Sequence, residues 1–119
     1  MLDTNATFRP LNELALEAHK IAVDHGWWDN PPTFGDVVAL CHSELSEALQ
    51  SYRNNEPMEF YDVKDDGSTT LEGYGVELVD TMIRILDFCG AVGLDVDAIM
   101  SEKMEYNRSR PYRHGGTRL

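Results

Sequence analysis

Two short acidic patterns interrupt apolar stretches of this chain and suggest a site for a hard metal ion. The first pair is Glu44 and Glu47, and the second is Glu77 and Asp80. A spacing of three places both carboxylates of a pair on one helical face, with Cβ atoms about 5–6 Å apart. Two such helices lying side by side would bring four negatively charged ligands together. Carboxylate ligands without cysteine favour Mg²⁺, or Mn²⁺ as a substitute, over zinc or copper.

Such a site implies a phosphorylated substrate. Magnesium rarely fills its octahedron with protein ligands alone and keeps positions for water and for substrate phosphates. An alternative for the second pair is an amphipathic helix whose acidic stripe simply faces water. That stripe also contains Arg84 and Asp87, and we expect Arg84 to pair with Asp80 or Asp87, a phosphate contact being the alternative. The first pair, at the same spacing, favours a shared site over coincidence.

The charge distribution points to a small ligand. The 119 residues carry a formal net charge of −11, which argues against general binding to nucleic acid or to anionic membranes, because binding to phosphate backbones requires Lys and Arg. Half of the ten Lys and Arg residues nevertheless lie after residue 102. This basic segment is predicted to contribute phosphate contacts from the end of the last helix and the tail, through Lys103, Asn107, Arg110 and Arg113.

The elements that must position these residues are helices. Apolar periodicity predicts helices from Pro10 to about residue 25, over 34–53, over 76–92 and from Asp95 to about residue 110. Thr33 and Asp36 resemble a capping box, Asp95 is an expected cap, and Gly93 an expected terminator. The connection 54–75 is long, and a short hairpin is expected at Phe60–Val63 with a turn at Asp66–Gly67.

The fold expected from these elements is all-α. It is a four-helix, bundle-like single domain, residues 1–119, with a long connection between the second and third helices and a basic tail over 108–119. The third helix is apolar around most of its circumference and is expected to be central. A chain of this size has little stability in reserve, so a homodimer or homotetramer is predicted.

The two cysteines suggest where the protein resides. Cys41 and Cys89 lie among apolar neighbours without metal-binding spacing, and we interpret them as buried free thiols of a cytoplasmic protein. The N-terminus has no basic and apolar segments of the kind that direct export, and no apolar run is long enough to span a membrane.

Taken in order, these residues resemble a known family. Glu44-x-x-Glu47, then Glu77-x-x-Asp80, then Lys103-x-x-x-Asn107 are similar to the all-α nucleoside triphosphate pyrophosphohydrolases of the MazG-like superfamily. The resemblance covers about residues 11–115. The connection between the two acidic pairs is longer here than is usual in the family.

The resemblance implies an activity and roles for residues. Glu44, Glu47, Glu77 and Asp80 would bind Mg²⁺, and water would attack a (deoxy)nucleoside triphosphate to give the monophosphate and pyrophosphate. Glu47 is the candidate catalytic residue that orients or deprotonates this water. In the dCTP pyrophosphatase branch, a His and a Trp nine residues later help to hold the base, and His19 and Trp28 have that spacing. Trp27 is expected to pack against the turn at Gly26 instead.

Two other classes of function remain open. A di-metal carboxylate oxidase would also place carboxylates on helices, but it requires Glu-x-x-His on two of them, and neither acidic pair has His at that step. A non-catalytic helical interaction module with a vestigial metal site would be expected to have lost ligands, and all four carboxylates are present.

Overall fold

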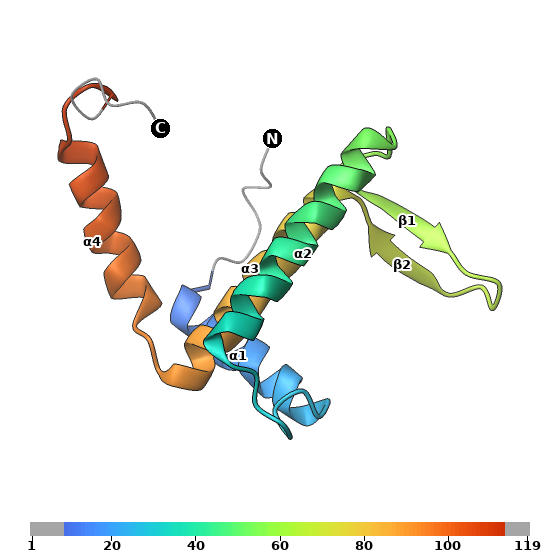
Figure 1. Ribbon diagram of the computed structural model, residues 1–119, viewed down its shortest axis with the longest axis horizontal. Coiled ribbons are helices and arrows are strands. Elements are labelled where there is room, and N and C mark those ends of the chain that lie inside the picture. The colour runs from blue at the N-terminus through green and yellow to red at the C-terminus, as the bar shows by residue number, and fades with distance from the viewer. Residues whose placement is uncertain (1–8, 114–119) are drawn as a thin grey trace.

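The computed structural model describes residues 9–113 and is mostly helical (Figure 1). In chain order its elements are α1 (Leu11–Asp24), α2 (Phe34–Arg53), β1 (Phe60–Val63), β2 (Thr69–Glu72), α3 (Tyr74–Val92) and α4 (Val96–Ser109). The four predicted helices and the predicted hairpin are confirmed. The predominantly helical character expected of the fold is confirmed as well, with the two strands as its non-helical part. Residues 114–119 of the predicted basic tail lie outside the described residues.

Helix α3 is the centre of the fold and packs against both α1 and α2. Its contact with α1 is close because two small residues meet there. A Cβ atom at Gly90 would lie only 2.4 Å from the carbonyl oxygen of Ala15, which is itself 2% exposed. The absence of a side chain at position 90 therefore lets the backbones of α1 and α3 approach each other. Cys41 of α2 and Cys89 of α3 are buried free thiols, as predicted.

The predicted helix ends are also confirmed. Thr33 and Asp36 form a complete capping box at the start of α2, with each side chain accepting a hydrogen bond from the backbone N–H of the other. Gly93 ends α3 in the left-handed conformation, with φ of 70°. Asp95 caps α4 by accepting a hydrogen bond from the N–H of Ala98. These local signals fix α2, α3 and α4 where the sequence predicts them.

The first turns of α1 and α4 cap each other, which the sequence did not predict. The carboxylate of Asp97 accepts hydrogen bonds from the N–H groups of Leu11 and Asn12, at 2.8 and 3.1 Å. In return, Oδ1 of Asn12 accepts from the N–H groups of Val96 and Asp97, at 2.8 and 3.2 Å, and its Nδ2 donates to Asp95. This reciprocal cap satisfies orphan donors of both helices and holds their N-termini together.

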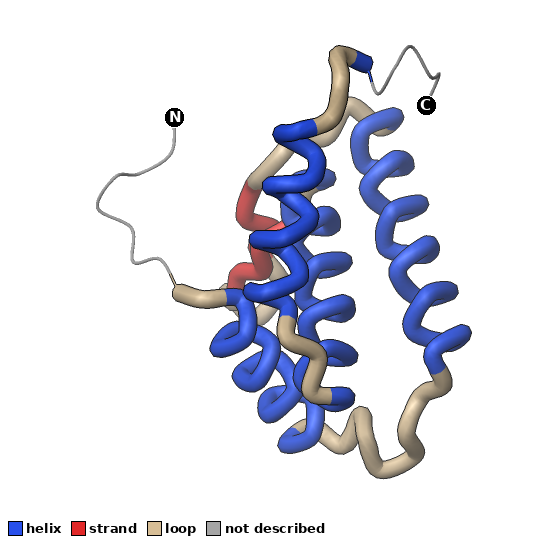
Figure 2. The backbone as a smooth tube through the Cα atoms, turned by 90° about the vertical axis from the view of Figure 1, so that its left-hand side faces the viewer, coloured by secondary structure: helices blue, strands red, loops and turns tan. Residues whose placement is uncertain are grey.

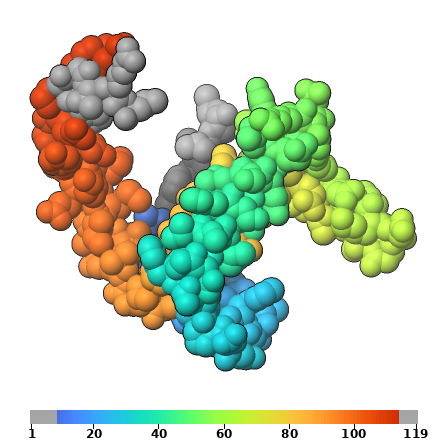
Figure 3. All heavy atoms as spheres, viewed as in Figure 1, coloured from blue at the N-terminus to red at the C-terminus, as the bar shows by residue number. Residues whose placement is uncertain are grey.

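Beyond this cap, α4 leads away from the other helices. Its contacts with the rest of the described chain are mainly with α1, and none of its residues is buried. It stands clear of α2 in two perpendicular views (Figures 1 and 2), and side chains leave the space between the two helices open (Figure 3). The four helices therefore do not close into a bundle within one chain, unlike the bundle-like arrangement expected from the sequence.

The hairpin projects from the α2–α3 pair at the end remote from the α3–α4 turn (Figure 1). Strands β1 and β2 are antiparallel, with Phe60 opposite Glu72 and Val63 opposite Thr69. Its base is tightly packed, since the N–H of Gly75 donates to the carbonyl of Met58 and a Cβ at Gly73 would lie 2.3 Å from that same oxygen. None of the described helices is long and apolar enough to cross a membrane.

Candidate metal centre and adjoining pocket

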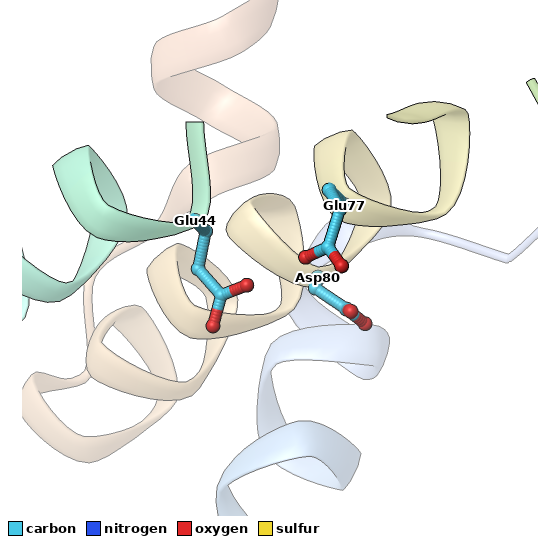
Figure 4. A group of neighbouring side chains, drawn as sticks. All are labelled: Glu44, Glu77 and Asp80. Carbon is cyan, nitrogen blue, oxygen red and sulfur yellow. The ribbon is translucent and has the colours of Figure 1, made fainter. Parts of the chain in front are cut away.

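Three of the four predicted carboxylates meet between α2 and α3. Glu44 comes from α2, and Glu77 and Asp80 come from successive turns of α3. One oxygen of each lies within 4.8 Å of the others. Figure 4 shows Glu77 and Asp80 side by side, with Glu44 facing them from the other helix. We call Glu44, Glu77 and Asp80 the acidic triad. It offers oxygen ligands alone, which is the donor set that suits a hard divalent cation.

Glu47 lies one turn after Glu44, outside the triad, and is exposed. Its negative charge nevertheless reaches the site, because it contributes to raising the pKa of Glu77. The predicted fourth ligand is therefore at the edge of the acidic triad. A carboxylate in that place can contact a water molecule or a metal ion at the solvent side of the site.

Arg84 pairs with the triad across the two helices. Its Nε and one terminal nitrogen both lie 2.9 Å from Oε1 of Glu44. The expected pairing with Asp80 or Asp87 on its own helix is therefore wrong. The Glu44 side chain is only 14% exposed, compared with 22% for Asp87. An ion pair in such partly buried surroundings is screened less by water than an exposed one.

The pKa values of the acidic triad reflect three nearby carboxyl groups with only one positively charged partner among the described residues, Arg84. The pKa of Glu77 is raised to about 7 by partial burial, by its hydrogen bond with Glu44 and by the charges of Glu47, Glu44 and Asp80. Burial and the charge of Glu44 also raise the pKa of Asp80. Burial would raise the pKa of Glu44 too, but hydrogen bonds with Glu77 and Arg84 lower it. Of the three carboxyl groups, Glu77 is therefore the one that takes up a proton most readily.

A pocket of about 810 Å³ adjoins the triad. Glu44, Asp80 and Arg84 line it from α2 and α3, and Trp27 and Trp28 line it from the loop after α1. Most of the remaining wall is apolar and includes Ile21, Val37, Leu40, Ile83 and Phe88. Its volume lies within the range of small-molecule sites, which combine apolar walls with a few polar groups.

Asp87 organises the aromatic side of this pocket. The indole Nε1 of Trp28 donates to both of its oxygens, at 2.9 and 3.2 Å. Nδ1 of His19 lies 2.9 Å from Oδ1 and must carry the proton, because a carboxylate only accepts. The two rings also meet edge to face, with centroids 4.8 Å apart. Asp87 lies two turns after Asp80, a spacing that places it on the same helical face and is the only sequence signal of its role.

The two predicted base contacts are thus brought together, with a difference in detail. His19 uses Nδ1 for Asp87, so only Nε2 is left for a ligand, and Trp28 can offer its ring face to the pocket. Trp27, expected to pack against the turn, is instead 74% exposed. Its lack of burial follows from the direction of the loop, which turns Trp28 rather than Trp27 towards α3.

The predicted phosphate contacts on α4 and beyond it lie apart from the acidic triad. Lys103 and Arg110 both rest over the ring of Tyr106, at 4.7 and 5.5 Å from its centroid, and Arg113 lies over the ring of Tyr112. Asn107 is exposed on the same helix. Because α4 leads away from α2 and α3, the structure does not bring these four residues to the site in one chain. Arg84 is the basic side chain that lines the described pocket.

Comparisons with known proteins found no match to a protein-family model, and no significant similarity to a curated protein or to a solved structure.

Proposed function

We propose that this protein is a Mg²⁺-dependent pyrophosphohydrolase of (deoxy)nucleoside triphosphates, of the MazG-like type, that serves nucleotide-pool housekeeping. The observation that carries the proposal is one pocket lined by both acidic ligands and an aromatic wall. Glu44 and Asp80 lie on this pocket together with Trp28 and Phe88. A ligand with a negatively charged, metal-binding part and a flat, stacking part fits both features, and a nucleotide has both.

We assign each residue of the site a role according to its chemistry. The acidic triad would hold Mg²⁺, with Mn²⁺ as a substitute, and Trp28 would stack on the base while Asp87 and His19 fix the indole ring. Arg84 lies between these two regions and can donate to a phosphate oxygen when it leaves Glu44. Glu47, at the exposed edge, remains the candidate to orient or deprotonate the attacking water.

The bound cation would polarise phosphoryl oxygens and offset the charge that develops on pyrophosphate as it leaves. The chain's own contribution is to supply ligands that are already close together and partly shielded from water. The raised pKa values of Glu77 and Asp80 support this assignment, since these carboxylates are poorly neutralised without a cation. Buried free thiols at Cys41 and Cys89 accord with a reducing compartment, and we place the activity in the cytoplasm.

The test is a panel of nucleoside triphosphates incubated with the full chain and Mg²⁺, with separate assays for pyrophosphate and phosphate. We expect release of pyrophosphate and a nucleoside monophosphate, and loss of activity in excess chelator. Asp80→Asn retains the shape of the side chain but removes a negative ligand, so turnover should fall by orders of magnitude. Asp65→Asn, the same change at an exposed turn residue, is the matched control and should keep full turnover.

The alternatives make different predictions in this experiment. An interaction module with a vestigial site would bind Mg²⁺ without hydrolysing any nucleotide. A carboxylate oxidase would bind iron with an oxo-bridged absorption band. Full hydrolysis in chelator, or wild-type turnover by Asp80→Asn, would contradict the proposed site.

A further inference from the structure

Asp87 has hydrogen-bond acceptor capacity that its two described partners do not use. Its Oδ1 accepts hydrogen bonds from Nε1 of Trp28 and Nδ1 of His19, both at 2.9 Å, whereas the described residues give Oδ2 only the longer contact with Nε1 of Trp28, at 3.2 Å. A carboxylate can accept about four hydrogen bonds. The side chain is 22% exposed and lines the pocket beside the acidic triad. Oδ2 is therefore placed to accept a further hydrogen bond from a molecule bound in the pocket.

The two partners also hold this acceptor in place. The indole N–H and the imidazole N–H both donate to the carboxylate, and the two rings meet edge to face, with centroids 4.8 Å apart. A carboxylate has no proton to donate, so it cannot adapt to a ligand that also offers an acceptor. Such a ligand would leave both acceptors without a proton, which weakens binding because neither group recovers the hydrogen bonds that it made with water.

Asp80 and Asp87 mark the two ends of one face of α3. They are seven residues apart in the sequence, which is about two turns and about 10.5 Å along the helix axis. Arg84 lies between them, and all three side chains line the pocket. This separation is close to the length of a nucleoside monophosphate from its phosphorus to the edge of the base remote from the sugar. With the phosphates at the acidic triad and the base against Trp28, that remote edge meets Asp87.

Nucleobases differ in what they offer at this edge. Cytosine and adenine carry an amino group there, which is a donor, whereas uracil, thymine and guanine carry a carbonyl oxygen, which is an acceptor. Asp and Glu side chains accept a hydrogen bond from the amino group of cytosine in nucleic-acid recognition. Asn30 also lines the pocket, but its amide can donate or accept and so does not select between the two kinds of base. Asp87 does select, because it only accepts.

We propose that Asp87 is a specificity-determining residue that selects nucleotides of cytosine and adenine, which have an amino group at the remote edge of the base, over nucleotides with a carbonyl oxygen there. The amino group donates to Oδ2 while the base stacks on Trp28. The inference rests on the proposed function, because it needs the phosphates at the acidic triad, and it adds the class of base that the site accepts. It also gives Asp87 a contact with the ligand besides its contacts with Trp28 and His19.

The experiment measures the binding of matched nucleotides to the full chain by titration calorimetry with Mg²⁺ present. The probes are α,β-imido triphosphates, in which nitrogen replaces the bridging oxygen so that pyrophosphate is not released. They form two pairs, cytosine with uracil and adenine with hypoxanthine, which differ at the edge of the base and share the sugar and the phosphates. The amino member of each pair should bind at least about tenfold more tightly. Equal affinities, tighter binding of the carbonyl members, or no binding of any probe would overturn the proposal.

Asp87→Asn tests whether the selection comes from this residue. The amide oxygen can still accept from Trp28 and His19, which leaves the NH₂ group to face the ligand as a donor. The variant should therefore bind the carbonyl members more tightly than the amino members, a reversal that a purely structural role does not produce. A loss of affinity shared equally by both members would show that Asp87 only supports the indole ring, and would overturn the proposal.

Two further variants serve as controls. Asp65→Asn makes the same change at an exposed turn residue and should leave the affinities and their ratios at wild-type values. Asp80→Asn acts at the phosphate end, because it removes a proposed metal ligand, and should weaken both members of each pair by the same factor. Circular dichroism checks that Asp87→Asn is folded, and the wild-type ratios decide the case if it is not.

Hydrolysis of the ordinary triphosphates separates this inference from the proposed function. Probes that bind with the expected ratios, together with triphosphates that release no pyrophosphate, would refute the proposed hydrolysis and support base selection by Asp87. Release of pyrophosphate at equal kcat/KM within each pair, together with equal affinities of the probes, would support the proposed hydrolysis and overturn the selection.

Discussion

At the scale of single residues, we expect the proton on Glu77 to make the proposed binding of Mg²⁺ depend on pH. The pKa of Glu77 is raised to about 7, above its ordinary value, so below pH 7 this residue carries a proton that Mg²⁺ must displace. We expect the affinity for Mg²⁺ to rise about tenfold per pH unit up to about pH 7 and then to level off. Titration calorimetry from pH 6 to 8, in buffers of different ionisation enthalpy, measures both the affinity and the proton released.

The same carboxyl group also determines how the stability of the metal-free protein changes with pH. Its folded-state pKa is higher than that of the unfolded chain, so the stability it contributes is complete below about pH 4.5 and is lost as pH rises through about 7. Glu77→Gln should abolish the released proton and flatten this dependence. A pH-independent affinity in the wild type would show that Glu77 is already ionised without metal.

Trp28 permits a second prediction at this scale, because it has two separable properties. Trp28→Ala should weaken nucleotide binding by about 1–3 kcal/mol and inorganic triphosphate binding much less, since stacking acts on the base. Trp28→Phe keeps a ring face but loses the N–H that Asp87 accepts, so it should recover part of the nucleotide affinity. Binding is measured by calorimetry for both ligands. Equal losses for nucleotide and triphosphate would assign Trp28 to the fold instead.

At the scale of elements, the junction of α1 and α4 is open to a direct test. Asn12→Ala removes one donor and one acceptor that together make three of the cross-junction hydrogen bonds. Loss of such a cap should cost about 1–2 kcal/mol and lower the melting temperature by several degrees. Asn54→Ala is the matched control, because this residue accepts a single exposed side-chain bond from Gln50, and it should shift stability by less than about 0.5 kcal/mol. Thermal unfolding followed by circular dichroism compares the two variants. Equal shifts in melting temperature would show that the α1–α4 cap does not stabilise the fold.

The elements also show what the sequence can and cannot predict. Helix ends follow from local chemistry, which is why Thr33, Gly93 and Asp95 marked them correctly. The partners of Arg84, Asp87 and Asn12 are set by the packing of segments 40 to 85 residues apart, and no local pattern encodes such distances. The triad itself was predictable, because two spacings of three on adjacent helices are enough to bring Glu44, Glu77 and Asp80 together.

At the scale of the whole molecule, stability should depend on protein concentration. If two copies share their apolar faces, dilution favours dissociation, and the separated chains have little core of their own. The melting temperature should fall measurably for each tenfold dilution of the wild type. Met104→Glu places a charge on an apolar α4 side chain that is 55% exposed, so it should melt lower and show no such dependence. Ser101→Glu adds the same charge at an exposed polar position of α4 and should follow the wild type. Scanning calorimetry over a hundredfold range of concentration gives the comparison.

The open space beside α4 is also the part of the fold that sequence periodicity could not predict. An apolar stripe predicts each helix. It indicates only that other residues cover the stripe, and these can belong to the same chain or to another one. The reciprocal cap of α1 and α4 accompanies the outward direction of α4. This cap depends on Asn12 and Asp97, which lie 85 positions apart in the sequence. Four predicted helices therefore do not establish that all four pack against one another within one chain.

The hairpin has a consequence for how this chain can vary. Its base is fixed by the contact of Met58 with Gly73 and Gly75, whereas a side chain at Gly67 in its turn would meet nothing within 4 Å. Lengthening a loop at such a tip costs little free energy, about 0.6 kcal/mol for each doubling of its length. Peptide tags or whole reporter domains inserted at 66–67 should therefore leave the helices and the acidic triad in register, so that this turn can serve as an attachment point.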